Sequence, residues 1–139
     1  MNPNTPALHL SNSPRPRRFR FPKSARLTRT SEFAKVKNEG ESSHGRLMVL
    51  SVLKTAEREP RIGLITSRRL GNAVKRNAVR RRLREIVRME RARLRPGLWL
   101  VLVARKAAAG APFEALREDW LRLAKRASIF ENQNDVRRE

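Results

Sequence analysis

The sequence predicts a single α+β domain in which helices pack on one β-sheet. Its length of 139 residues is typical of one domain. Segments with the alternating pattern of strands and segments with the helical period of about 3.6 residues follow one another, in the order α-β-β-α-β-α. A short additional strand fits at 41–44. Helices and strands in such an order bury their apolar sides against each other, in an α+β or sandwich architecture.

Residues 1–25 are expected to form a disordered basic arm. They contain five of the eight prolines and no acid, since Glu32 is the first acidic residue of the chain. An arginine-rich, acid-free start is also typical of organellar transit peptides, but these prolines oppose the amphipathic helix that such a peptide needs. An arm that adds phosphate contacts is therefore favoured. The folded domain is expected at 26–130, followed by a polar tail at 131–139.

The first half of the domain predicts one helix and two strands. Thr30 or Ser31 can cap a short helix that ends near residue 38. The segment 46–54 has apolar residues on both of its faces, which is typical of a central strand. A further strand is expected at 61–67, where Gly63 predicts the close approach of another backbone.

The second half predicts a long basic helix, a buried strand and a last helix. The basic helix follows Gly71 and is stopped by Pro96 and Gly97. The apolar run at 98–104 has the length of a strand. Pro112 suits the first turn of the last helix. The apolar stripe of that helix consists of Phe113, Leu116, Trp120, Leu123 and Ala127.

The basic helix has two distinct faces. Its apolar stripe consists of Val79, Leu83, Ile86 and Val87. Its opposite side carries Asn77, Arg81, Arg84 and Arg88. A row of guanidinium groups repels itself unless a polyanion lies against it. The helix therefore predicts one face that packs on a core and one that binds an anionic partner.

The composition favours nucleic acid as that partner. The formal net charge is +20 and the isoelectric point is about 11.9. Nucleic acid is the default partner at this charge, and an anionic membrane surface is the main alternative. The absence of cysteine excludes disulfides and thiolate metal sites and fits a reducing cytoplasm. No apolar run is long enough to span a bilayer, and no signal peptide is visible.

Residues that could support catalysis by the protein alone are few. His9 falls in the arm and His44 in a turn, where a lone histidine is usually a surface residue. Glu114, Glu118 and Asp119 could hold a hydrated metal ion, but a solvated helix face is favoured. No glycine-rich phosphate-binding motif is present. We therefore expect neither a catalytic residue nor a metal site in this protein.

The start of the basic stretch forms a longer pattern. Residues 67–81 read Ser-Arg-Arg-Leu-Gly-Asn-Ala-Val-Lys-Arg-Asn-Ala-Val-Arg-Arg. They combine a basic pair, Gly-Asn-Ala, Arg-Asn and further basic residues at helical spacing. This combination closely resembles the signature of the protein subunit of bacterial ribonuclease P. The resemblance extends over about 26–129 and includes Glu32 and Phe33, the strand at 61–64 and the strand exit at 104–106.

This resemblance implies a fold and a function. Members of the family partner a large catalytic RNA, and the complex removes the 5′ leader of precursor tRNA. The RNA supplies the active site and holds Mg²⁺, while the protein positions the substrate and neutralises charge. The implied fold is a two-layer α/β sandwich like domain 2 of ribosomal protein S5. It has a left-handed β-α-β crossover, where general rules favour a right-handed one.

The expected protein is therefore cytoplasmic and monomeric, in a one-to-one complex with its RNA. A general or ribosome-associated RNA-binding protein without a catalytic partner is the first alternative, because fold alone leaves it open. A nuclease that acts without RNA is the second alternative, although the chain lacks an acid-base cluster for it.

The resemblance and the helix face together imply a set of RNA-binding residues. These are Arg68, Arg69, Asn72, Lys75, Arg76, Asn77, Arg80, Arg81, Arg84 and Arg88. Guanidinium groups match phosphate oxygens through paired hydrogen bonds, which supports the assignment. Asn77 could instead fix the start of the helix.

A second implied surface is a cleft over the sheet that holds the single-stranded leader. Its expected residues are Phe33, Lys37, Ser51, Arg105 and Lys106. Phe33 matches a family aromatic on which a base could stack, although core packing is an alternative. Lys37 and Ser51 stand where further aromatics are common, and Ala78 stands where the family often has arginine. The cleft is therefore expected to hold the leader more by charge than by stacking.

Overall fold

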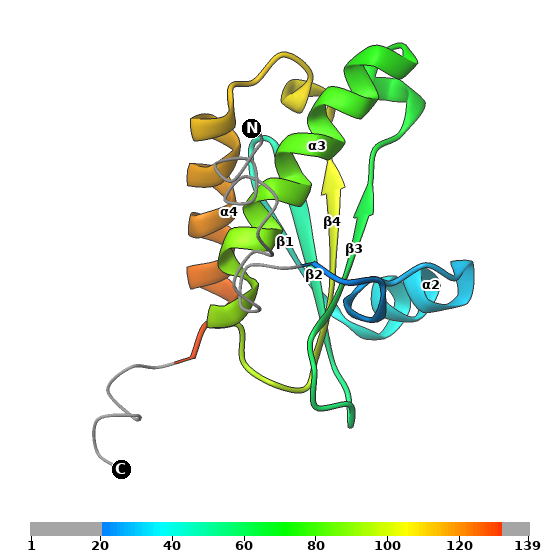
Figure 1. Cartoon of the computed structure of the whole chain (residues 1–139), viewed down its shortest axis with the longest axis vertical. Coiled ribbons are helices and arrows are strands. Elements are labelled where there is room, and N and C mark those ends of the chain that lie inside the picture. Colours follow the sequence, from blue (N-terminus) through cyan, green and yellow to red (C-terminus); the bar gives the residue numbers. More distant parts are fainter. Residues whose placement is uncertain (1–20, 132–139) are drawn as a thin grey trace, which may run out of the picture.

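The structure, a computed structural model, describes residues 21–131 and confirms the α+β class. Its helices are α2 (Thr30–Glu39), α3 (Ala73–Glu90) and α4 (Phe113–Ala127) (Figure 1). Its strands are β1 (Glu41–His44), β2 (Met48–Lys54), β3 (Arg61–Ile65) and β4 (Leu98–Ala104). Short 3-10 helices are η2 (Lys23–Ala25), η3 (Arg68–Leu70), η4 (Arg91–Arg93) and η5 (Lys106–Ala108). The short strand that fits at 41–44 is present as β1.

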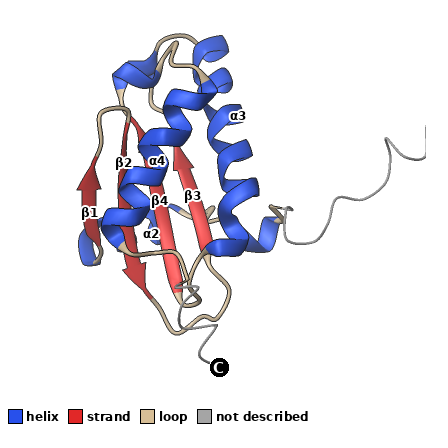
Figure 2. Ribbon diagram, turned by 90° about the vertical axis from the view of Figure 1, so that its left-hand side faces the viewer, coloured by secondary structure: helices blue, strands red, loops and turns tan. Residues whose placement is uncertain are grey.

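All the strands form one sheet in the order β1-β2-β4-β3. β2 pairs antiparallel with both β1 and β4, so its expected central position is confirmed. β3 runs parallel to β4, and α3 connects the two. In Figure 2, α3 and α4 lie in front of the sheet and β3 lies to the right of β4. With both strands running upward, the chain therefore moves leftward through α3, and this crossover is left-handed.

The main core lies between the sheet and the helices α3 and α4. The expected apolar stripe of α3, Val79, Leu83, Ile86 and Val87, is buried there. From α4 the buried apolar residues are Leu116, Trp120, Leu123 and Ala124. Leu50, Leu100 and Leu102 are fully buried and complete the sheet side of this core.

A smaller core lies on the opposite face of the sheet, under α2 (Figure 1). Val36 from α2 and Trp99 and Val101 from β4 are buried in it. Val103, the next residue of β4 on this face, is only half-buried. α2 therefore covers one end of this face and leaves the end near the C-termini of β3 and β4 more open.

The expected boundary at residue 26 is too late. Phe21 is 9% exposed and Ala25 is 1% exposed, and both belong to the main core. The backbone N–H of Leu27 donates to the carbonyl of Ile62, which attaches this segment to the edge of β3. Residues 21–25 are therefore part of the fold, because one aromatic in the basic run reaches the core. The rest of the expected arm, 1–20, and the tail at 132–139 lie outside the described residues.

Two local expectations are corrected. Neither Thr30 nor Ser31 caps α2, since both lie inside it. Instead Glu32 Oε1 accepts hydrogen bonds from the backbone N–H groups of Thr28 and Arg29, both at 3.0 Å. At Gly63 the close neighbour is an aromatic ring and not a backbone, because a Cβ there would lie 2.4 Å from Cε1 of Phe33.

Candidate nucleic-acid interface

The uncharged residues of the basic signature build the turn that begins α3. Ser67 Oγ accepts a hydrogen bond from the backbone N–H of Arg69 at 3.3 Å. Gly71 has a φ of 123°, a backbone conformation that favours glycine. Asn72 caps α3, because its Oδ1 accepts from the backbone N–H of Lys75 at 3.0 Å. These residues position the cations on either side of the turn.

Most of the expected RNA-binding residues are exposed on η3 and α3. The exposed members are Arg68, Arg69, Asn72, Lys75, Asn77, Arg81 and Arg84. The half-buried members are Arg76, Arg80 and Arg88. α3 therefore presents most of the expected face to solvent while its apolar stripe is buried.

Two of the half-buried arginines are held by neutral groups. Arg76 Nη1 donates to the carbonyl of Gly71 at 3.1 Å. Arg80 donates from Nη2 to Thr66 Oγ1 at 2.6 Å and from Nη1 to Asn77 Oδ1 at 3.0 Å. Neutral partners restrain a guanidinium without cancelling its charge, so both arginines stay attractive to an anion. Asn77 orients Arg80 and does not fix the helix start, which Asn72 does.

Arg88 differs from the rest of the expected set. It forms a bidentate ion pair with Glu85, and its side chain is only 19% exposed. The hydrogen bonds to Glu85 raise the pKa of Arg88 and outweigh its burial. The charge of Arg88 is thus compensated inside the protein, and the row of uncompensated cations along α3 ends at Arg84.

The residues expected to line the leader cleft lie on or beside the α2 face of the sheet. Phe33 is half-buried, with its ring against Gly63, and Lys37 is exposed on α2. Ser51 does not line an open surface, because it is 6% exposed and its hydroxyl bonds to Ser42 Oγ at 2.7 Å. Ser51 pairs with Val101 in the sheet register and so lies on the α2 face, but it is largely covered.

Arg105 and Lys106 lie where β4 ends, at the open end of this face. Both are exposed, and Arg105 Nη1 donates to the carbonyl of Gly45 at 2.8 Å. The 3-10 helix η5, which begins at Lys106, packs against η3. The 3-10 helix that carries Arg68 and Arg69 therefore lies beside the one that begins at Lys106, near the C-terminal ends of β3 and β4 (Figure 1).

Asp119 has a supporting role that the helical pattern does not reveal. It is 1% exposed, in contrast to the expected solvated face, whereas Glu114 and Glu118 are exposed. Its Oδ2 accepts from the backbone N–H of Leu47 at 2.9 Å, and its Oδ1 accepts from Arg122 at 2.8 Å. Asp119 thereby holds the turn between β1 and β2, the same turn to which Arg105 bonds.

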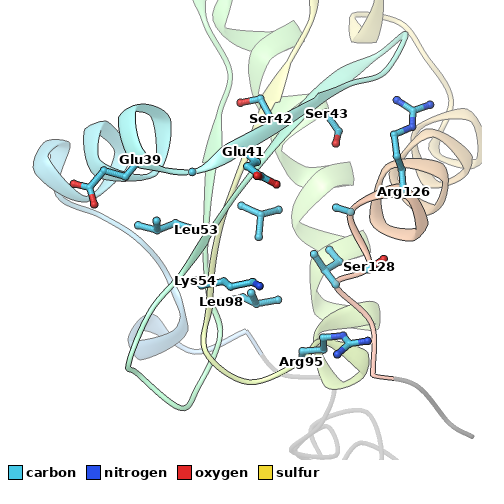
Figure 3. A pocket seen from close by; sticks show the side chains of 14 residues that line it. Glu39, Glu41, Ser42, Ser43, Leu53, Lys54, Arg95, Leu98, Arg126 and Ser128 are labelled. Atoms are coloured by element: carbon cyan, nitrogen blue, oxygen red, sulfur yellow. The ribbon is translucent and has the colours of Figure 1, made fainter. Parts of the chain in front are cut away.

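A large hollow of about 650 Å³ lies elsewhere, between the sheet and the C-terminal end of α4. Glu41 and Lys54 line it from the sheet and Arg126 from α4, as Figure 3 shows. None of the expected RNA-binding or cleft residues lines it. Its acidic and basic side chains give it no clear preference for a polyanion.

Two further features bear on chemistry. Within 21–131, no group of three or more histidine, aspartate or glutamate side chains is arranged to hold a metal ion. No helix of the described part is both long and apolar enough to cross a membrane. The geometry on these residues is that of a binding surface rich in cations, with the cations supplied by η3, α3 and the end of β4.

Known proteins share both this sequence and this structure. The family profile described as Ribonuclease P matches residues 21–128. The ribonuclease P protein component of Symbiobacterium thermophilum is 39% identical over 112 residues, which cover 80% of this chain and 97% of that protein. The corresponding protein of Syntrophomonas wolfei is 32% identical, with 82% and 97% covered.

Solved structures agree with these sequence matches. The ribonuclease P protein from Thermotoga maritima superposes with a TM-score of 0.66 at 30% identity, over 73% of this chain and 96% of that one. A Staphylococcus aureus ribonuclease P protein, a mutant described as defective in mRNA degradation, has a TM-score of 0.73 at 25% identity, with 78% and 92% covered. Since the profile spans nearly all of the described residues, and the relatives match over almost their whole length, this chain belongs to the ribonuclease P protein family.

Proposed function

We propose that the basic face of η3 and α3 and the open face of the sheet are the two RNA-binding surfaces of this chain. As a member of its family, the chain is the protein component of a bacterial ribonucleoprotein endoribonuclease, and it acts with an RNA in the 5′ processing of tRNA. The finer assignment is that the face of α3 binds the catalytic RNA and the open sheet face binds the leader of precursor tRNA.

One observation carries this assignment. The 3-10 helix η3, which holds Arg68 and Arg69, packs against η5, which begins at Lys106, so the basic elements of the two proposed surfaces are neighbours. A polynucleotide that lies across this junction would meet a cation at successive phosphates. Phe33, with part of its ring exposed beside the face, would add a stacking surface for a base.

The role proposed for the protein is electrostatic and positional. Arginine and lysine side chains lower the repulsion between two RNA strands that must come together, and they orient the leader relative to the cleavage site. We assign Mg²⁺ to RNA phosphates, as the family resemblance implies. The complex is proposed to contain one copy of the chain per RNA and to act in the cytoplasm.

Reconstitution tests the function. The purified chain is mixed with its cognate RNA and with precursor tRNA at low Mg²⁺, and leader removal is compared with that by the RNA alone. We expect faster cleavage with the chain, because its cations replace part of the screening that Mg²⁺ provides. The double variant Arg81→Ala/Arg84→Ala should lose most of this gain.

Two other outcomes would support the alternatives. Tight RNA binding without faster cleavage would indicate a general RNA-binding protein. Cleavage by the chain with no RNA subunit present would indicate a nuclease that acts alone, and a preparation treated with ribonuclease controls for carried-over RNA.

A further inference from the structure

A second, smaller hollow of about 240 Å³ lies beside the free edge of β3. Within the described residues β3 pairs with β4 on one side only, and the segment around Arg26 touches its other edge at Ile62. The hollow opens between this segment and α3. The residues that define it are Phe21, Arg26, Thr28, Leu64, Arg80 and Arg84.

This hollow concentrates positive charge. Arg26 comes from the segment ahead of α2, whereas Arg80 and Arg84 come from α3, and no acidic residue of the described part of the chain lines the hollow. Within 21–131 none of these three arginines forms an ion pair with a carboxylate. Guanidinium groups gathered at one place repel each other, so an anion between them is strongly favoured.

Several other arginines of the described residues form ion pairs with carboxylates. Arg61 bonds to Glu32 at 2.9 Å, Arg93 bonds to Glu90 at 2.7 Å, and Arg122 bonds to Asp119 at 2.8 Å. The three arginines of the hollow lack such partners among the described residues. The charge of these three arginines is therefore not compensated by a carboxylate of the described residues.

Two of the three guanidinium groups are already held in place. Arg26 Nη2 donates to the carbonyl of Phe21 at 2.9 Å, and its guanidinium lies over the Phe21 ring at 5.0 Å. Arg80 is held by Thr66 and Asn77. Side chains that are ordered before a ligand arrives lose less conformational entropy when they bind it. Arg84 is exposed and connects the hollow with the open basic face of α3.

We propose that this hollow binds a phosphate of the RNA backbone and that Arg26 contributes to it from outside the basic signature. The proposal rests on the RNA-binding function proposed above and adds one contact to it. A polynucleotide on the face of α3 would enter the hollow, where the guanidinium groups of Arg26, Arg80 and Arg84 surround one phosphodiester group. The segment 21–28 is thereby part of the RNA-binding surface as well as of the core.

The salt dependence of RNA binding tests the site. The affinity of the full chain for its cognate RNA is measured at several salt concentrations, for the wild type, Arg26→Gln and Lys125→Gln. We expect Arg26→Gln to weaken binding about tenfold. We also expect it to reduce the slope of log K against log[salt] by about 0.7 to 0.9, the value of one phosphate contact. Lys125 is exposed on α4, outside the hollow, so Lys125→Gln controls for the loss of one positive charge.

A double-variant comparison tests whether the arginines share one phosphate. If Arg26 and Arg84 hold the same group, the loss of affinity in Arg26→Gln/Arg84→Gln should be smaller than the product of the two single losses. Arg26→Gln/Lys125→Gln should instead show the simple product. Independent losses for Arg26 and Arg84 would overturn the shared site.

A charge-preserving variant and melting temperatures distinguish loss of the phosphate contact from loss of folding. Arg26→Lys preserves the charge, so it should bind better than Arg26→Gln, and melting temperatures show whether each variant is folded. A wild-type slope in Arg26→Gln would overturn the site and leave binding through α3 intact, whereas a wild type that does not bind RNA would overturn the proposed function.

Inorganic phosphate is also added to the RNA-free chain. If Arg26 governs the rise in melting temperature with phosphate but not the salt slope with RNA, the site binds free phosphate and the RNA assignment is wrong.

Discussion

Each arginine of α3 takes its role from its neighbours. Arg81 and Arg84 stand on the exposed side of the helix, opposite the buried Val79 and Leu83. Arg88 lies one turn after Arg84 on the same side, yet Glu85 pairs with it. One acid in a basic helix is therefore enough to compensate the charge of one arginine on the face proposed to bind RNA.

The first prediction concerns these arginines. Arg81→Ala and Arg84→Ala should each weaken RNA binding about tenfold, because each loses a charged hydrogen bond to phosphate. Their free energies of unfolding should stay within about 0.5 kcal/mol of the wild type, as is usual for exposed side chains. Arg88→Ala is the matched comparison, and we expect it to affect RNA binding less. Thermal unfolding and an RNA titration measure both quantities, and a large fall in melting temperature for Arg81→Ala would show that its face is misassigned.

Glu32 links the start of α2 to β3. Burial by itself would raise the pKa of Glu32, but backbone hydrogen bonds from Arg29 and Thr28 and the bond from Arg61 outweigh it. The pKa of this carboxyl therefore lies below its ordinary value in the folded protein. A group with a lowered pKa stabilises the fold above its unfolded pKa of about 4.3, and this stability is lost as the pH falls through the folded value.

The second prediction follows from the lowered pKa of Glu32. Glu32→Gln should lower the free energy of unfolding at pH 7 by about 1 kcal/mol, since it weakens the helix cap and the pair with Arg61. The difference from the wild type should shrink as the pH falls below about 4, where the wild-type carboxyl also becomes neutral. Denaturant unfolding at several pH values measures it, with Glu39→Gln at the far end of α2 as the control. A difference that does not change with pH would contradict the linkage.

At the scale of elements, α4 supports the cleft from the opposite side of the sheet. Asp119 reaches from α4 to the backbone of Leu47, and the turn of β1 and β2 that it holds also accepts the bond from Arg105. Gly45 belongs to the same contact, because a Cβ there would lie 2.5 Å from Asp119 Oδ2. A buried carboxylate on one element thus determines where a surface cation of another element lies.

The third prediction tests this support. Asp119→Ala leaves the buried N–H of Leu47 without its acceptor, which should cost about 1 to 3 kcal/mol of stability. Asp119→Asn retains an acceptor and should cost less. Thermal unfolding gives the stability, and amide hydrogen exchange at Leu47 reports whether the turn has loosened. Wild-type protection of Leu47 in Asp119→Ala would disprove the role of this carboxylate.

For the whole molecule, charge and apolar surface are separated. The main core fills the space between the sheet and the helices α3 and α4, whereas exposed cations lie on η3, on the outer side of α3 and at the end of β4. Residues 1–20 add Arg15, Arg17, Arg18 and Arg20 to the charge of the chain. Charge of this size acts on partners and solubility and does not specify the fold.

The fourth prediction separates the arm from the fold. Deletion of residues 1–20 should keep the melting temperature near that of the full chain and lower the salt slope of RNA binding. The slope should fall by about 0.7 to 0.9 for each phosphate that the arm binds in the full chain. Deletion of 1–25 removes Phe21 and Ala25 from the core and should also lower the melting temperature. An unchanged slope after the shorter deletion would mean that the arm does not contact RNA.

Helical and strand periodicity predicted most elements because burial here follows local pattern. The stripe of α3, the central position of β2 and the run that becomes β4 are all confirmed. Features made by long-range neighbours were missed or misjudged. Phe21 reads as part of a basic arm and Asp119 as a solvated acid, and each is buried by segments distant in sequence.

By itself, the sequence determined the class of fold, the basic face and the family, since spacing along one helix specifies which residues share a side. Only the tertiary structure decided which cations from distant segments lie in one place. Arg88 is compensated within its own helix, whereas the hollow at Arg26, Arg80 and Arg84 joins segments more than 50 residues apart in the chain. Ion pairs and burial depend on distances in space, and packing brings together residues from distant segments that a local sequence pattern does not predict.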